Sequence, residues 1–145
     1  MVLDGLKRVC FWVVLGVLLF GCGEESRIEG KDRFQPDRNG IIVDTRTGLH
    51  WSPDPGRRMT WHQAEAYARQ LRLGGFADWR LPTRAELRDL GAGGLDSAFK
   101  LAGNCAWSSE REDDSSAWEF HFREGRDYWL FINRHAQVLA VRSRR

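Results

Sequence analysis

The chain of 145 residues carries 22 Lys and Arg against 20 Asp and Glu, which gives a formal net charge of only +2 at pH 7. A charge this small creates no strong field that would collect nucleic acid, so we do not expect nucleic acid as a partner. Without its apolar N-terminal segment the chain is long enough for one domain with a single core, and too short for two.

The N-terminal segment has the form of a bacterial lipoprotein signal. Two basic residues precede the apolar residues 9–20, which are followed by Gly21 and Cys22. A charged start, a short apolar stretch and a small residue before the cut are the parts of a secretory signal. A cysteine directly after the small residue predicts acylation of its thiol and cleavage in front of it. The apolar stretch is shorter than the roughly 20 residues that span a bilayer, which argues against an uncleaved anchor.

The expected cleavage divides the chain into a signal peptide, a tether and a domain. Residues 1–21 are the predicted signal peptide, and Cys22 becomes the lipid-bearing N-terminus that contacts the membrane. We expect export to the cell envelope. In enteric-type signals, an aspartate directly after the cysteine retains the protein at the inner membrane. This chain has Gly23 at that position, so we expect sorting to the outer membrane. Residues 22–37 are polar and lack periodicity, which predicts a tether, and residues 38–145 are the predicted domain.

Two short strands joined by a turn are predicted first in the domain, at residues 41–43 and 49–51. Thr60 and Gln63 then have the spacing of a capping box, in which each side chain bonds to the backbone of the other residue. This pattern and the apolar residues at helical spacing behind it predict a helix to about Leu73.

Thr83 and Glu86 form the pattern of a second capping box, which predicts a short helix that ends at the glycines from Gly91 onward. Alternating aromatic and β-branched residues then predict strands at residues 105–107, 117–122, 128–132 and 138–141. Strands and helices do not alternate as βαβ units. The sequence therefore predicts an α+β fold, with an antiparallel sheet and two helices packed on it.

One cysteine is expected in the mature domain. Cys10 lies in the signal peptide and Cys22 carries the lipid, which leaves Cys105 alone in an oxidising compartment, with no partner for an internal disulfide. A lone cysteine can be a nucleophile, but no feature of the sequence pairs Cys105 with a base. We therefore expect a buried and inert thiol.

Several stretches of the sequence resemble one known family. They are Val43-Asp44-Thr45-Arg46-Thr47-Gly48-Leu49-His50-Trp51, Leu73-Gly74-Gly75-Phe76-Ala77-Asp78-Trp79-Arg80-Leu81-Pro82-Thr83 and Trp107-Ser108-Ser109. These stretches are similar to the DUF1566 domain, also called the Lcl C-terminal domain, and the similarity extends from about Asn39 to Arg142. The resemblance implies a C-type-lectin-like fold, in which two helices pack on a twisted antiparallel sheet with long irregular loops. The signature residues that we expect to be structural are Trp51, Trp79, Arg80, Leu81, Pro82, Thr83, Glu86, Trp107 and Trp118.

The chain departs from this family at two positions. Many members carry cysteine where Ala68 stands and another near Ala140, and the resemblance implies that such a pair joins the first helix to the last strand. Both residues are alanine in this chain, which removes about 2 to 4 kcal/mol of crosslink stabilisation. The core must then rely on its large aromatic side chains, so we expect five tryptophans to be buried: Trp51, Trp61, Trp79, Trp107 and Trp118.

No metal site and no cofactor is expected from the sequence. Calcium needs about 6 to 8 oxygen ligands, and the lectin-like tripeptide Gln35-Pro36-Asp37 precedes the first predicted strand, where it cannot meet other ligands. The acidic residues between 110 and 114 lack the spacing of a calcium loop and are interpreted as a solvated loop. The 4 histidines share no close i, i+4 spacing that would indicate a metal site on a helix.

A second resemblance offers an enzymatic alternative. Residues 80–83 with Glu86 resemble the formylglycine-generating enzymes, which share this fold superfamily and oxidise a substrate cysteine with copper held by a cysteine pair. Such Cu(I) chemistry needs two thiolates, and Cys105 is the single thiol of the predicted domain, so we expect no catalysis. An exposed Cys105 beside a histidine in a cleft would favour the enzyme. We explain the motif locally, with Asp78 and Arg80 paired across the turn before the helix.

The function that the sequence favours is that of a non-catalytic, lipid-anchored binding or adhesion domain whose ligand is a glycan or an envelope protein. A degenerate enzyme of the formylglycine-generating type and a structural envelope protein without a small ligand are the alternatives. In the fold that the sequence resembles, loops form the binding surface, so we expect ligand contacts from residues 91–104 and 109–116. The candidate ligand-binding residues are Glu110, Arg111, Asp113, Asp114 and Trp129.

Overall fold

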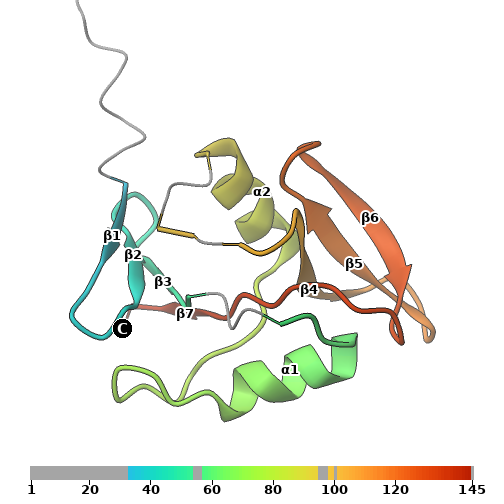
Figure 1. The fold of residues 1–145 in the computed structure, drawn as a ribbon, viewed down its shortest axis with the longest axis horizontal. Coiled ribbons are helices and arrows are strands. Elements are labelled where there is room, and N and C mark those ends of the chain that lie inside the picture. The colour runs from blue at the N-terminus through green and yellow to red at the C-terminus, as the bar shows by residue number, and fades with distance from the viewer. Residues whose placement is uncertain (1–32, 54–56, 95–97, 100, 145) are drawn as a thin grey trace, which may run out of the picture.

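The computed structural model of the protein describes residues 33–53, 57–94, 98–99 and 101–144. This part of the chain contains two helices and two antiparallel sheets (Figure 1), which confirms the predicted α+β class. The predicted signal peptide and Cys22 lie outside the described residues. Within them, no helix is both long enough and apolar enough to cross a membrane.

The first sheet has four short strands in the order β1-β2-β3-β7, all paired antiparallel. They are β1 (Phe34–Pro36), β2 (Ile42–Asp44), β3 (Leu49–Trp51) and β7 (Val141–Ser143). The predicted hairpin corresponds to β2 and β3. The turn before β2 is closed by Asp37, whose carboxylate accepts hydrogen bonds from the backbone N–H groups of Asn39 and Ile41 at 2.8 and 2.9 Å. Aspartate favours such turns because its short side chain can bond to the backbone a few residues ahead.

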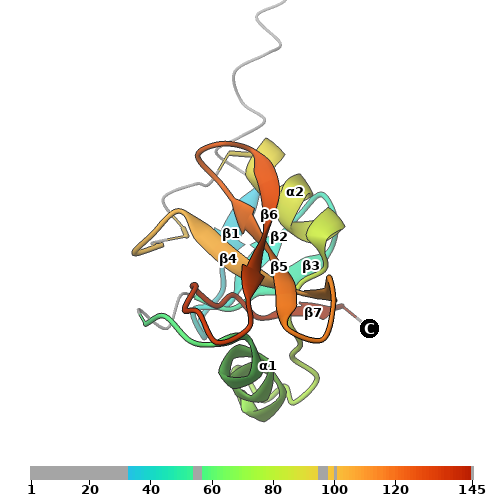
Figure 2. The same ribbon diagram turned by 90° about the vertical axis from the view of Figure 1, so that its right-hand side faces the viewer.

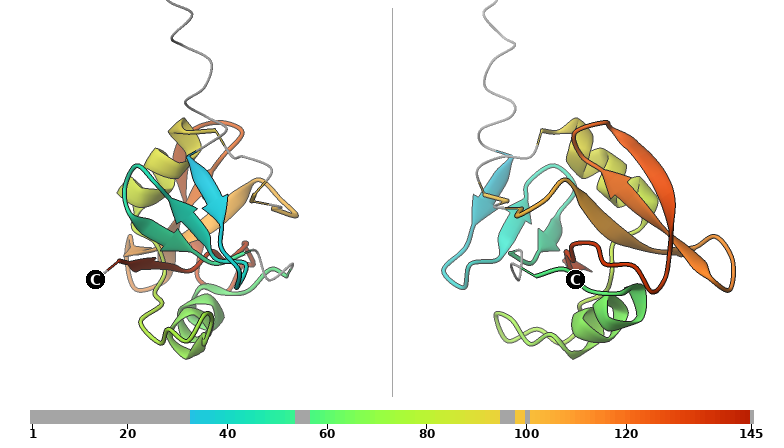
Figure 3. Two further views of the ribbon diagram at one scale, coloured as in Figure 1. Left: turned by 90° about the vertical axis from the view of Figure 1, so that its left-hand side faces the viewer. Right: turned by 45° about the vertical axis from the view of Figure 1, so that its right-hand side comes forward.

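The second sheet has three strands in the order β4-β5-β6 and lies at the other end of the domain (Figure 3). They are β4 (Cys105–Arg111), β5 (Ser116–His121) and β6 (Arg126–Phe131). β4 is longer than predicted and includes residues 109–111, which we expected to lie in an irregular loop. The remaining residues form a tight hairpin turn, in which the N–H groups of Glu112 and Asp113 donate to the Ser116 carbonyl at 3.0 and 3.3 Å.

Two helices, α1 (Trp61–Gln70) and α2 (Arg84–Ala92), lie on opposite sides of the C-terminal part of the chain (Figure 2). α1 begins at the predicted capping box, because the Thr60 hydroxyl accepts from the Gln63 N–H and the Gln63 side chain accepts from the Thr60 N–H. It ends earlier than predicted, because Leu71 has extended backbone angles of φ −60° and ψ 130°. The helix buries one apolar face made of Trp61, Ala64 and Ala68.

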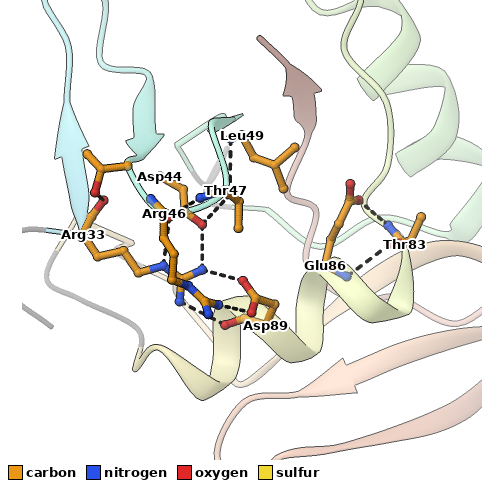
Figure 4. Close-up of polar contacts among 9 residues, drawn as sticks. Arg33, Asp44, Arg46, Thr47, Leu49, Thr83, Glu86 and Asp89 are labelled. Carbon is orange, nitrogen blue, oxygen red and sulfur yellow. Dashed lines mark hydrogen bonds and ion pairs between the residues drawn. The ribbon is translucent and has the colours of Figure 1, made fainter. Parts of the chain in front are cut away.

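α2 begins at the second predicted capping box, formed by Thr83 and Glu86 (Figure 4). Glu86 also accepts two hydrogen bonds from the Arg80 guanidinium, at 2.8 and 2.7 Å. The predicted pairing of Asp78 with Arg80 is therefore wrong, and Asp78 instead accepts from Arg142 at 2.7 and 3.2 Å. Glu86 is the better partner for Arg80 because the capping box already holds its carboxylate in place.

The domain begins earlier than predicted, because β1 lies within the segment that we expected to be a tether. Arg33 is buried beside β1 and donates two hydrogen bonds to Asp44, at 2.9 and 2.6 Å, and one to Asp89 at 2.5 Å (Figure 4). Asp44 also accepts from the Thr47 hydroxyl at 2.7 Å. Burial alone would raise the pKa of Asp44, but these hydrogen bonds outweigh it and hold the pKa below its ordinary value. The paired charges tie β1 and β2 to α2, so the structured domain includes Arg33.

The C-terminal segment runs through the centre of the domain, and its residues 136–141 are all buried. The strand predicted at residues 138–141 is displaced to β7, because the backbone at Ala136 and Gln137 forms only isolated bridges, to Met59 and to Ala106. Ala136 exchanges hydrogen bonds with Met59 at 2.8 and 3.0 Å, and the Gln137 carbonyl accepts from the Trp107 N–H at 3.1 Å. The segment therefore connects the loop before α1 to β4.

Large aromatic side chains fill the core on both sides of this segment. The tryptophans that are at most 5 % exposed are Trp51, Trp61, Trp79 and Trp107. Trp118 is half-buried. Ala68 and Ala140, where the resemblance implies a cystine in many members, are both fully buried in the same apolar cluster.

We expect Trp79→Ala to lower the free energy of unfolding by about 3 to 5 kcal/mol, because removal of a buried indole leaves a cavity. Trp79 is 3 % exposed within the larger apolar cluster. As a comparison, Thr83→Ala removes one helix cap and should lower it by only about 1 kcal/mol. Urea denaturation followed by circular dichroism measures both values. Similar losses for the two variants would contradict the packing described above.

Candidate functional site

Three of the predicted ligand-binding residues, Arg111, Asp113 and Asp114, take part in hydrogen bonds of the β4–β5 hairpin turn. The Asp113 carboxylate accepts from the N–H and the hydroxyl of Ser115 at 2.7 and 2.9 Å, and these hydrogen bonds hold the pKa of Asp113 below its ordinary value. The Arg111 guanidinium donates to the backbone carbonyls of Asp113 and Asp114. These polar groups stabilise the shape of the turn.

Glu110 belongs to a different surface, which α2 shares with the second sheet. Its carboxylate accepts a hydrogen bond from the backbone N–H of Arg84, the first residue of α2, at 2.9 Å. The Arg84 guanidinium carbon lies 3.7 Å from the ring centre of Trp118, and the guanidinium donates to Asp127 at 3.1 and 2.8 Å. Trp118 is directly paired with Trp129 across β5 and β6. Arg84 therefore brings Glu110 and Trp129 to the same face of the domain.

β6 carries the exposed aromatic side chains of this face. It is the outer strand of its sheet (Figure 1), and Trp129 and Phe131 are 54 % and 52 % exposed. The two residues lie two positions apart and so project from the same face of the strand. Their rings are 5.6 Å apart at an angle of 79°. Exposed aromatic groups on a rigid strand are typical of a surface that binds another molecule.

The opposite face of the second sheet lines a cavity of about 570 Å³. This volume lies in the range of about 300 to 1,000 Å³ that is common for small-molecule sites. The predicted loop at residues 91–104 contributes Ala102, Gly103 and Asn104 to the lining, whereas its residues 95–97 and 100 lie outside the described part of the chain. Most other lining side chains are polar, and exposed ones at the rim include Arg58, Asn133, Arg134 and His135.

Cys105, Glu119 and His121 come together at the wall of this cavity. Antiparallel pairing places Cys105 directly across from His121, and Glu119 lies two residues before His121 on the same face of β5. The sulfur, one carboxylate oxygen and one imidazole nitrogen all lie within 4.8 Å of one another. His121 is therefore a base near Cys105, a pairing that no feature of the sequence indicated. Such a set of donor atoms is suited to holding a metal ion or to exchanging a proton.

The Cys105 thiol is nevertheless a weak nucleophile in this environment. Burial is the main cause that raises its pKa, and the negative charge and hydrogen bonding of Glu119 add to it, so that the pKa reaches about 12. A thiol with this pKa is protonated at neutral pH, and only the thiolate is an effective nucleophile. The histidine and the cavity that would favour an enzyme are present, but the thiol is half-buried and is not activated.

Glu119 and His121 are not among the functional residues predicted from the sequence. A signal for them exists, because Glu-x-His within a predicted strand places both side chains on one face. Their position opposite Cys105 could not be read from the sequence. It depends on the register between β4 and β5, which shifts at an irregularity between Trp107 and Arg111.

We expect Cys105 to react slowly with iodoacetamide at mildly alkaline pH. The fraction of thiolate falls tenfold for each unit by which the pKa rises, so modification of the folded protein should be at least about 100-fold slower than that of the protein unfolded in guanidinium. Peptide mass spectrometry measures modification of Cys105 separately from that of the other cysteines. Equal rates in the two states would show that the thiol is not shielded.

The sequence model of the Lcl C-terminal domain matches residues 40–142. The matched region extends from the turn before β2 into β7, and so includes the exposed aromatic strand and the cavity. No curated protein matches the chain. The family match agrees with the resemblance carried by the sequence signature around Trp79 and Arg80. The chain therefore belongs to the Lcl C-terminal domain family.

Proposed function

We propose that this chain is a non-catalytic glycan-binding domain, held at the bacterial cell envelope by a lipid on Cys22, and that β6 carries its binding face. The observation that carries the proposal is the exposure of Trp129 and Phe131, since more than half of each side chain is accessible on the outer strand of a sheet. The C-type-lectin-like fold stays a prediction and supports binding by analogy alone, because fold does not determine function.

The chemistry of this face suits a sugar ring. A pyranose has an apolar C–H face, which can stack on an aromatic ring, and a polar edge of hydroxyl groups. Next to the aromatic pair, Arg84 and Arg88 both donate to Asp127, and the Arg88 side chain is 52 % exposed. Exposed donors beside an apolar ring can bond to sugar hydroxyls while the ring is stacked. Glu110 offers an exposed acceptor on the same face.

The size of the aromatic patch favours a glycan over a protein partner. Among the described residues, Tyr128, Trp129 and Phe131 are the exposed large hydrophobic side chains, and Tyr128 lies on the opposite face of β6. A stable protein interface buries about 1,200 to 2,000 Å², which is far more than two aromatic rings supply.

An enzyme of the formylglycine-generating type is the second candidate, and the position of Cys105 beside His121 in a cavity is the observation that favours it. Copper chemistry of that type needs two thiolates. Cys105 is the single cysteine of the described residues, and its raised pKa disfavours the thiolate. The glycan-binding proposal requires no such activation, so the geometry supports it better.

If Cys22 carries the lipid, we expect Cys22→Ser to abolish acylation, because a hydroxyl cannot form the thioether to the lipid. Cells that express the protein are labelled with a fatty acid, and the label on the purified protein is compared between wild type and variant. Cys105→Ser is the matched control and should keep its label. Equal labelling of wild type and Cys22→Ser would refute the anchor while leaving the binding face untouched.

If β6 carries the glycan-binding face, we expect Trp129→Ala to weaken glycan binding by about tenfold or more, as is typical for the loss of a central aromatic contact. A glycan array identifies the ligand of the wild-type protein, and calorimetry then measures the affinities of the variants. Tyr128→Ala, on the opposite face of the same strand, is the control and should bind like wild type. Unchanged affinity in Trp129→Ala, or an array on which nothing binds, would contradict the proposal.

A further inference from the structure

The cluster of Cys105, Glu119 and His121 lies on the face of the second sheet that points away from Trp129, so it is independent of the proposed glycan face. The Glu119 carboxylate is 3.4 Å from Nε2 of His121, and the Cys105 sulfur is within 4.8 Å of both groups. Three different donor atoms thus converge from two neighbouring strands. Because β4 and β5 are hydrogen-bonded to each other, their backbones hold the donors in place.

One carboxylate oxygen of Glu119 lacks a hydrogen-bond partner. The residue is 6 % exposed, and its Oε2 is buried without a hydrogen-bond partner in the described structure. A buried carboxylate oxygen without a partner is costly, because that atom has lost its hydration and has no hydrogen bond to replace it. A cation between Glu119 and its neighbours would supply the missing interaction.

His121 is oriented in the way that metal-binding histidines usually are. Its Nε2 faces Glu119, and its Nδ1 lies 3.7 Å from the carboxylate of Glu124. Glu124 is itself bonded to the Tyr128 hydroxyl, and the Tyr128 ring contacts the imidazole edge to face at 5.1 Å. A carboxylate near the second ring nitrogen orients a metal-bound histidine and increases its basicity. Glu124 is thus placed as a positioning residue.

From these observations we propose that Cys105, Glu119 and His121 bind a divalent transition-metal ion, with Zn²⁺ as the preferred one. Sulfur, imidazole nitrogen and carboxylate oxygen are the donors that zinc takes, whereas calcium and magnesium prefer oxygen alone. Tetrahedral zinc places its donors about 3.3 to 3.8 Å apart, so the cluster needs to contract by about 1 Å. On binding, the S–H bond breaks, a sulfur–metal bond forms and the proton leaves to solvent.

The proposed ion keeps one open coordination position, which faces the cavity. Three protein ligands leave the fourth position of a tetrahedral ion to water or to a small ligand. Arg58 and Arg134 line the same cavity and carry positive charge at its rim. The site therefore suits a small anionic group, such as a carboxylate or phosphate, as the fourth ligand.

The test is a metal titration of the purified full-length chain after treatment with a chelator. We expect one Zn²⁺ per chain, and we expect Co²⁺ to give the thiolate-to-metal charge-transfer absorption of a four-coordinate site. Cys105→Ser should abolish this absorption. Glu119→Gln and His121→Gln should weaken binding more than Glu124→Gln, for which a loss of about 10- to 100-fold is expected.

Three controls make the outcome decisive. His62→Gln, on the exposed face of α1, and the double variant Cys10→Ser/Cys22→Ser should both bind like wild type. Circular dichroism checks that each variant is folded, and if Cys105→Ser does not fold, Glu119→Gln and His121→Gln decide. No charge-transfer absorption in the folded wild type, or binding that survives in both of these variants, would overturn the proposal. Neither result depends on whether the β6 face binds a glycan.

Discussion

The fold depends on one constraint, which is that the buried backbone of residues 136–141 must find hydrogen-bond partners at the centre of the domain. A buried N–H or carbonyl without a partner is costly, so partners must come from whatever packs against the segment. Four separate parts of the chain supply them, through Met59, Trp107, Ser52 and Arg80. The segment thereby joins the loop before α1, β4, the end of β3 and the approach to α2.

This constraint also determines which way the second sheet faces. The hydrogen bond from Trp107 to Gln137 holds β4 against the central segment, and β5 and β6 extend outward from it. Because side chains alternate along a strand, the two faces of this sheet differ in chemistry. One face presents Trp129 beside α2, and the other presents Glu119 and His121 to the cavity. A single three-stranded sheet thus offers two chemically distinct and separate surfaces.

Ion pairs connect parts of the chain that are far apart in sequence. Arg33 bonds to Asp89 across 56 residues, and Arg142 bonds to Asp78 across 64 residues. Both pairs include an arginine that is at most 7 % exposed, and a buried guanidinium needs an anionic partner. The first pair ties β1 to α2, and the second ties β7 to the turn before Trp79.

The sequence by itself determined the α+β class, both capping boxes, the β2–β3 hairpin and the family signature, because each of these depends on residues close together in the chain. Only the tertiary structure decided that β1 belongs to the domain, that β4 continues to Arg111, and that Arg80 pairs with Glu86 while Asp78 pairs with Arg142. It also brought Cys105 to Glu119 and His121. Cross-strand register and long-range ion pairs produce these results, and both depend on how distant segments pack and not on the local preferences of either one.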